Sequence, residues 1–134
     1  MTARNRLVAL ALLAGCTAAG DEPVILSIVN AGPAPLRCLV IHGHWVTADV
    51  PVIGPGASTD IAVLRDPAER SLFTLREDGR RLMIEQVACG LDEVWSATLT
   101  YADVEAARSG DAPRAVLTCD VSRPRACATF QSAP

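Results

Sequence analysis

His42 and His44 are the only histidines of the chain, and a single glycine separates them in the segment His42-Gly43-His44-Trp45. On a β-strand, residues two positions apart point to the same face, so the two imidazoles would lie side by side and chelate Cu²⁺ or Zn²⁺. A third ligand would have to be a carboxylate or Cys38, which has the same parity along the strand. The alternative interpretation is a pair of surface or half-buried histidines beside a core Trp45.

Motifs for covalent or hydrolytic catalysis are absent from the sequence. All 12 basic residues are arginine, so a lysine Schiff base and a P-loop lysine are both excluded. The sequence has no Gly-x-Ser-x-Gly, Ser-x-x-Lys or His-Glu-x-x-His pattern. A triad assembled from distant positions stays open, because such triads are defined in space. We therefore predict that the protein is not an enzyme and uses no cofactor.

The composition is that of one small domain with a weakly acidic surface. The chain has 134 residues, 50% of them hydrophobic, and a formal net charge of −3. This content is too apolar for a disordered chain, and the acidic balance removes the basic surface that nucleic-acid binding requires. We predict no nucleic-acid partner.

The N-terminal segment has the pattern of an export signal. Arg4 and Arg6 make its first residues positive, and an uninterrupted apolar run extends from Leu7 to Ala14. A membrane-spanning helix needs about 20 apolar residues, so this run does not anchor the protein by itself.

The segment Leu13-Ala14-Gly15-Cys16 resembles the lipobox of bacterial lipoprotein signal peptides. In that family the cysteine sulfur receives a diacylglyceryl group, the signal is cut just before the cysteine, and acyl chains such as palmitate hold the protein to a bilayer. The resemblance implies a signal peptide at residues 1–15, lipidation of Cys16 and a short tether at residues 16–22. Thr17 stands where inner-membrane members often have Asp, which favours the outer membrane. The resemblance does not extend beyond residue 16, and the family of the mature domain is not recognised.

Four cysteines remain after Cys16, and an even number in an exported domain predicts two disulfides. Three connectivities are possible, and sequence alone does not choose among them. Local geometry favours Cys119 with Cys127, because the residues between them are typical of two strands flanking a turn at 122–124. Cys38 then pairs with Cys89 by elimination. A zinc site is the competing interpretation, but Cys-x-x-Cys spacing is absent.

Short apolar, β-branched runs separated by turn residues predict a series of strands. The clearest turn is Asp78-Gly79, which as a two-residue loop would place Leu75 opposite Leu82 and Phe73 opposite Ile84. Cys89 falls on the opposite parity from Leu82 and Ile84, which a bulge or the end of the strand would explain. The other expected strands are 23–29, 36–47, 50–53, 59–64, 91–100, 115–120 and 126–131.

The expected fold is mainly β, a small antiparallel β-sandwich of immunoglobulin-like or related architecture, crosslinked by disulfides. In such a sandwich the Cys38–Cys89 bridge would pin the two sheets together, with Trp45 or Trp95 packed nearby. One short helix is expected near 102–109, because acids precede Arg108 and Gly110 follows it. The β-rich domain should span residues 23–131, and residues 132–134 should form a frayed tail.

These observations predict a lipoprotein of the cell envelope that faces the periplasm, with the outer membrane favoured over the inner. Its partners would be the bilayer, through acylated Cys16, and a protein of a membrane-associated assembly, for which it would be a non-enzymatic binding or accessory subunit. The alternative is a periplasmic lipoprotein that binds copper or zinc through His42 and His44.

Overall fold

The computed structural model describes residues 20–123 and 127–134, and these form a mainly β structure with few helices. Strands form where apolar and β-branched residues alternate or run together, as in the sequence 22–30. Within the described ranges, no helix is long and apolar enough to cross a membrane. The elements are β1 (Glu22–Asn30), β2 (Leu36–His42), η1 (Gly43–Trp45), β3 (Thr47–Asp49), β4 (Ser58–Asp66), β5 (Ser71–Leu75), β6 (Arg81–Leu91), α2 (Trp95–Thr98), β7 (Thr100–Asp103), α3 (Glu105–Ser109), β8 (Arg114–Cys119) and β9 (Gln131–Ala133).

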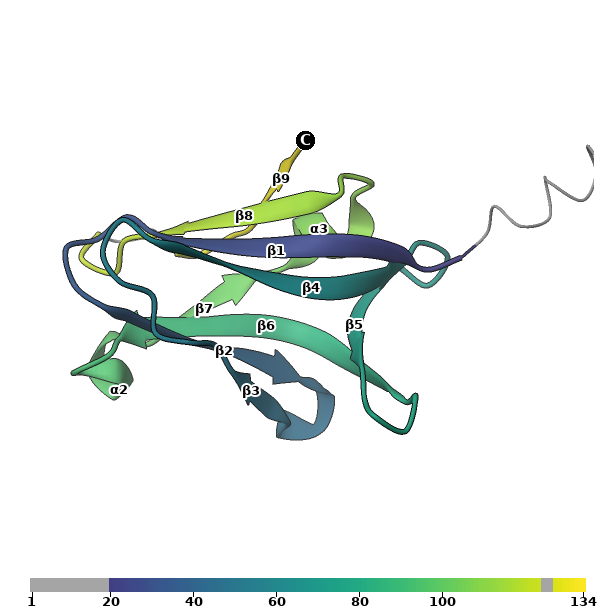
Figure 1. The fold of residues 1–134 in the computed structure, drawn as a ribbon, viewed down its shortest axis with the longest axis horizontal. Coiled ribbons are helices and arrows are strands. Elements are labelled where there is room, and N and C mark those ends of the chain that lie inside the picture. The colour runs from purple at the N-terminus through teal and green to yellow at the C-terminus, as the bar shows by residue number, and fades with distance from the viewer. Residues whose placement is uncertain (1–19, 124–126) are drawn as a thin grey trace, which may run out of the picture.

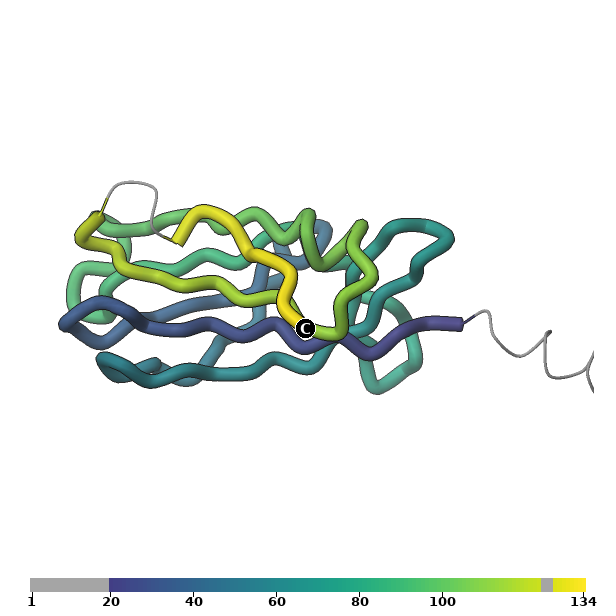
Figure 2. The backbone as a smooth tube through the Cα atoms, turned by 90° about the horizontal axis from the view of Figure 1, so that it is seen from above, coloured from purple at the N-terminus to yellow at the C-terminus, as the bar shows by residue number. Residues whose placement is uncertain are grey.

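The strands form one sheet that folds over on itself. Their order is β3-β2-β6-β5-β4-β1-β8-β9, and β7 also pairs with β6. Figure 1 shows β4, β1 and β8 in an upper layer, β2, β3 and β6 in a lower layer, and β5 connecting the two at one end. Seen from above, β1 lies between β4 and β8 (Figure 2). The two layers enclose the core, as expected for a sandwich.

One strand pair differs from the all-antiparallel arrangement that we expected. β1 pairs with β8 in parallel, from Ile25 opposite Arg114 to Asn30 opposite Cys119. The other edge of β1 pairs with β4 in the usual antiparallel way. β1 therefore has a neighbour on both edges, and the first strand of the domain becomes a central strand of the upper layer.

The core lies between the inner faces of the two layers. On β1, every second side chain points inward, and these residues are at most 1% exposed. They pack with inward residues of β2 and β6 and with Leu117 of β8 and Phe130 near the C-terminus. The buried residues named here are Val24, Leu26, Ile28, Val40, Val87, Leu117 and Phe130.

The two expected disulfides are present, Cys38–Cys89 and Cys119–Cys127. Cys38 and Cys89 are opposite each other on neighbouring strands, β2 and β6. The bridge therefore crosslinks two strands of the lower layer, and our expectation that it pins two sheets together is wrong. Cys119 ends β8, while Cys127 lies in a turn with a φ of 71°, so the second bridge is not the expected pair between two strands.

The disulfides nevertheless connect the layers by contact. The sulfur atoms of Cys89, Cys119 and Cys127 all lie within 4.8 Å of one another, and all three residues are buried. The bridge of the lower layer thus packs directly on the bridge at the end of β8. Sulfur is polarizable and fills irregular core space well, so this cluster serves as apolar packing as well as covalent crosslinking.

The hairpin at Gly79 forms, but its register differs by one residue from our expectation. Leu75 faces Arg81, and Phe73 faces Met83 instead of Ile84. The loop contains three residues, because the amide of Arg76 donates to the carbonyl of Arg80 and Gly79 adopts a φ of 81°. A type I turn followed by a left-handed glycine is a common three-residue hairpin loop, and Asp78-Gly79 fits it as well as the two-residue form.

Of the two explanations for the parity of Cys89, the structure has the bulge. Between β2 and β6 the register shifts after Ile41, which faces Gln86, so that the next residue, His42, faces Ile84. One residue of β6, Glu85, is left without a partner on β2. The bulge changes the parity of β6, and both Ile84 and Cys89 are therefore buried.

Our expectation of a strand at 91–100 is wrong. β6 ends at Leu91, the short helix α2 follows, and β7 begins only at Thr100. The hydroxyl of Thr98 accepts a hydrogen bond from the Leu91 amide at 2.8 Å and donates to the carbonyl of Val94. The local hydrogen bonds of Thr98 compete with strand pairing. The alternation of apolar and polar residues in this segment gave no indication of these bonds.

The expected helix near 102–109 is shorter than predicted, because α3 begins at Glu105 and Ala102 and Asp103 belong to β7. Segment 50–53 contributes only an isolated bridge, between Leu36 and Ile53, instead of a strand. The frayed tail that we expected at 132–134 is also wrong, since Ser132 and Ala133 pair with β8 as part of β9. The C-terminal residues cover the edge of β8, which a free tail would leave open.

Arg65 of β4 is a buried cation that ties α3 to the upper layer. Its guanidinium donates to the carbonyl oxygens of Ala107 and Ala112, at distances of 2.7 to 3.1 Å, and its Nε donates to Glu22 at 3.2 Å. The side chain is almost fully buried, and these partners satisfy its charge and its donors. The carbonyl oxygens of Ala107 in α3 and of Ala112 after it thereby gain hydrogen-bond donors.

We expect the two disulfides to differ in their contribution to stability, because they close loops of different length. The Cys38–Cys89 bridge spans 51 residues and the Cys119–Cys127 bridge spans 8. In the chain-entropy treatment, removal of the bridge that closes the long loop lowers the free energy of unfolding by about 4 kcal/mol, and removal of the bridge that closes the short loop lowers it by about 2.5 kcal/mol. Urea denaturation of Cys38→Ala/Cys89→Ala and Cys119→Ala/Cys127→Ala would measure both. A larger loss for the second variant would contradict the expectation.

Candidate functional site

His42 and His44 do not share a strand face, so the geometry on which the metal-site prediction rested is wrong. β2 ends at His42, and the next three residues form the turn η1. His44 has a φ of 60°, in the left-handed region, and its side chain is exposed, whereas His42 is buried. The rule that residues two apart point the same way applies only while the chain stays extended.

His42 lies at the end of the core, 3% exposed. Its Nε2 is 3.1 Å from the hydroxyl of Thr74 on β5, and its Nδ1 has no hydrogen-bond partner among the residues that the structure describes. Cys38 cannot act as a third ligand, because it is bonded to Cys89. Within the described ranges, the group of three ligand-type side chains found close together consists of disulfide cysteines. The described residues thus do not bring His42 and His44 together as a metal site, and the copper or zinc alternative stays a prediction.

His42 also lines a cavity that no sequence motif indicated. This cavity lies between the lower layer and β4 and has a volume of about 340 Å³. Its wall on the upper side is formed by residues 59–62 of β4, and on the lower side by Ala48 and Asp49 of β3. Val40, Val50 and Ile61 give it an apolar lining. We call this cavity the seam, because the two layers end there.

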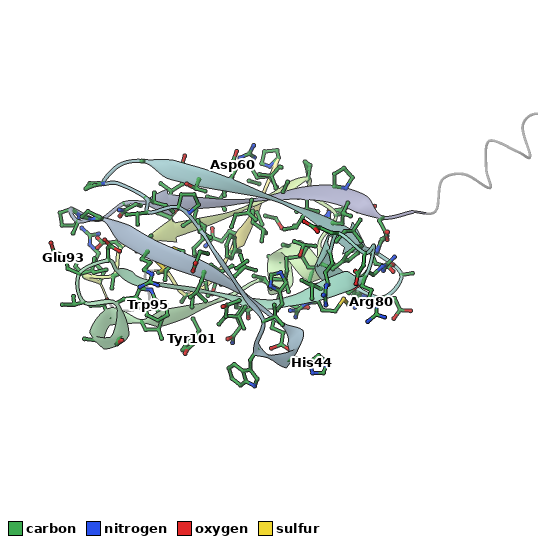
Figure 3. The ribbon with its side chains drawn as sticks, turned by 60° about the horizontal axis from the view of Figure 1, so that its bottom comes forward. His44, Asp60, Arg80, Glu93, Trp95 and Tyr101 are labelled. Carbon is green, nitrogen blue, oxygen red and sulfur yellow. A yellow bond between two sulfur atoms is a disulfide. The ribbon has the colours of Figure 1, made fainter. Side chains whose placement is uncertain are left out.

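The aromatic residues are divided between the interior and one outer surface. Phe73 and Phe130 are fully buried, whereas Trp45 and Tyr101 are 86% and 52% exposed. Tyr101 pairs with Ala88, one position from the inward pair Ala102–Val87, so it points away from the core. Figure 3 shows Tyr101, Trp95 and His44 along the same side of the molecule.

Trp95 is held on this surface by Arg37 of β2. The indole Nε1 donates to the carbonyl of Arg37 at 3.1 Å, and the Arg37 guanidinium lies 5.2 Å from the centre of the Trp95 ring. Gly90 of β6 makes the contact possible, since a Cβ there would lie 2.9 Å from the backbone oxygen of Trp95. We call Arg37, Trp45, Trp95 and Tyr101 the aromatic face. Its residues come from β2, η1, α2 and β7.

Trp45 is presented by a strained turn. Both His44 and Trp45 have positive φ values, 60° and 62°, and neither is glycine. Each left-handed position costs a non-glycine residue about 1 kcal/mol or more, and two in succession are normally occupied by Asn, Asp or Gly. Trp45 gains no burial in return, so our expectation of a core Trp45 is wrong.

The charged residues of the sequence form surface ion pairs. Arg81 contacts Asp21 and Asp66, each at 3.0 Å, and its guanidinium lies over the Phe73 ring. The hydrogen bond from Arg81 lowers the pKa of Asp66 below its ordinary value. These carboxylates serve as acceptors for arginine and do not form the pair of converging acids that general acid–base catalysis needs.

Comparison with known proteins does not assign the chain to a family. No protein-family model matches the chain, and no curated protein matches it. Among solved structures, an NMR structure of a protein from Eubacterium rectale is similar over 83% of this chain and 88% of that chain, with 11% sequence identity and a TM-score of 0.43. A likeness of this extent carries no functional argument.

We expect His44→Ala to leave the affinity for Cu²⁺ unchanged, because His42 is buried and bonded to Thr74 while His44 is exposed on a turn. Isothermal titration of the wild type and the variant with Cu²⁺ would measure this. A clear loss of affinity in the variant would contradict the placement of the two imidazoles.

Proposed function

We propose that the protein is a lipid-anchored lipoprotein of the bacterial cell envelope and a non-enzymatic binding or accessory subunit of a membrane-associated assembly. Cys16 carries the lipid, and the β domain faces the periplasm, with the outer membrane favoured over the inner. The lipobox-like segment and Cys16 lie outside the described residues, so the lipid attachment stands on the sequence resemblance. Two or three acyl chains on one residue would give durable attachment, since each buried methylene contributes about 0.8 kcal/mol.

The disulfides support an oxidising location for the domain. All four cysteines that follow Cys16 are paired, and both bridges are buried in the core. Buried, fully paired cysteines are typical of exported domains and rare in the reducing cytosol. This observation agrees with the export signal but does not depend on it.

The tether would keep the domain close to the bilayer. β1 begins at Glu22, six positions after Cys16. An extended chain reaches about 3.5 Å per residue, so the domain would lie within about 20 Å of the lipid. The chain enters the domain at one end of its long axis (Figure 1), and the aromatic face lies along the side of the molecule. A partner in the same membrane could therefore reach this face without competing with the anchor.

The observation that carries the binding role is the exposure of Trp45, 86%, on a turn in which His44 and Trp45 both have positive φ values. Tryptophan, tyrosine and arginine are the residues most enriched at the energetic centres of protein–protein interfaces. Aromatic residues make up 4% of the sequence, and Trp45 and Tyr101 both lie at the surface. The fold therefore does not use the apolar area of these two large side chains in its core. A protein partner that covers the aromatic face would restore that burial.

Replacement of Cys16 tests the anchor. We expect Cys16→Ser to abolish incorporation of labelled palmitate and to move the protein from the membrane fraction to the soluble fraction, because the thioether sulfur is lost. Thr17→Ser is the matched control and should remain membrane-bound. Membrane association of Cys16→Ser equal to that of the wild type would contradict lipid anchoring.

Replacement of Trp45 tests the aromatic face. In affinity capture from detergent-solubilised membranes, we expect Trp45→Ala to lose its co-purifying protein, with affinity at least about tenfold weaker, as for a residue at the centre of an interface. Val52→Ala is the matched control, because Val52 is 53% exposed, belongs to the segment between β3 and β4 and is not part of the aromatic face. Equal losses in both variants, or none in Trp45→Ala, would count against the assignment.

A further inference from the structure

β4 has a long unpaired edge beside the seam. On one side it pairs with β1 over Ser58–Arg65, but on the other side only its last three residues, Leu64–Asp66, pair with β5. β5 then leaves β4 and pairs with β6. Within the part of the chain that the structure describes, residues 58–63 therefore have a free edge. Natural proteins commonly shield such edges, because exposed backbone groups act as a template for another strand.

The backbone groups that face this edge can be identified. The amide of Asn30 donates to the carbonyl of Ala57 at 2.9 Å, so residue 57 points its backbone groups toward β1. Backbone direction alternates along a strand, and the N–H and C=O groups of Ser58, Asp60 and Ala62 therefore point toward the free edge. These are the groups to which an added strand would hydrogen-bond.

Two cavities follow the same edge. The seam, with a volume of about 340 Å³, extends along residues 59–62, and a second cavity of about 320 Å³ continues along residues 62–64. They share Ala62 and Thr74, where β4 and β5 separate. Six residues of extended chain measure about 20 Å, so the free edge matches a short strand in length.

The opposite wall of the seam is also a sheet edge. β3 has only three residues, pairs only with β2 among the described strands, and ends the lower layer. Its Asp49 makes no ion pair within the described ranges, whereas Asp60, on the β4 side, is bound to Arg114 at 3.3 Å. The seam thus offers unpaired backbone on one wall, apolar side chains between the layers and an unneutralised carboxylate on the other wall.

We propose that the seam binds an extended peptide segment of a partner protein, which pairs as a strand with the free edge of β4 at residues 58–63. Alternate side chains of the peptide enter the seam and contact Val40, Val50 and Ile61, while a basic residue of the peptide faces Asp49. Main-chain hydrogen bonds supply the affinity and the alternate side chains the specificity, as in other cases of strand addition. A small apolar molecule would fill the volume but would leave the backbone groups of Ser58, Asp60 and Ala62 unpaired. This site is separate from the aromatic face and does not require the lipid.

The test is a selection of random heptapeptides displayed on phage against the full-length chain with its disulfides formed. We expect enriched peptides that alternate apolar with polar residues and contain arginine or lysine. Synthetic copies of these peptides, labelled with a fluorophore, would then be titrated by anisotropy against the wild type and two variants. Ala62→Pro removes one N–H from the free edge, whereas Ala62→Thr keeps it and serves as the matched control.

We expect Ala62→Pro to weaken peptide binding at least tenfold and Ala62→Thr to bind as the wild type does. Circular dichroism of both variants would establish that each is folded, and Asp49→Asn should weaken only peptides with a basic residue. Failure to enrich any peptide, or equal affinity of Ala62→Pro and the wild type, would overturn the proposal. Uptake of an apolar dye by the seam without peptide selection would assign it to a small ligand instead. These results do not depend on the outcome of the palmitate labelling of Cys16→Ser or of the affinity capture with Trp45→Ala.

Discussion

The contact between the two disulfides is the interaction on which the rest of the domain depends. Cys38–Cys89 fixes β2 against β6 in the lower layer, and Cys119–Cys127 fixes the end of β8 in the upper layer. Their sulfur atoms meet in the core, where apolar side chains of both layers surround them. The covalent crosslinks therefore act at the place where the layers pack, and they hold the neighbouring strands that carry the aromatic face on one side and the seam on the other.

Sequence patterns predicted the β class and the two disulfides, and they offered a bulge in β6 as one of two explanations for the parity of Cys89. The sequence predictions failed where the same residues are compatible with more than one local structure. Asp78-Gly79 fits both a two-residue and a three-residue loop, and the choice shifts the register of Leu75 by one. The hydroxyl of Thr98 closes α2 in a segment whose alternation was typical of a strand.

The candidate sites were less predictable than the fold, because they arise from elements far apart in the sequence. The seam needs β2, β3 and β4 at once, and no motif marks a free edge. The prediction that His42 and His44 share one strand face was wrong because the strand ends between them. Two successive left-handed residues, His44 and Trp45, follow where glycine would be expected. Gly43 was the only indication that the strand stops there. The exposure of Trp45 is the opposite of what hydrophobicity alone predicts.

Pairing of β1 with β8 joins the first strand of the domain to nearly the last. Until Arg114–Cys119 has left the ribosome or crossed a membrane, one side of β1 has no neighbour to pair with. Because Cys119 ends that strand and bonds to Cys127, sheet closure and the second crosslink both require residues close to the C-terminus. For the exported protein that we propose, the complete sheet would therefore form late in translocation.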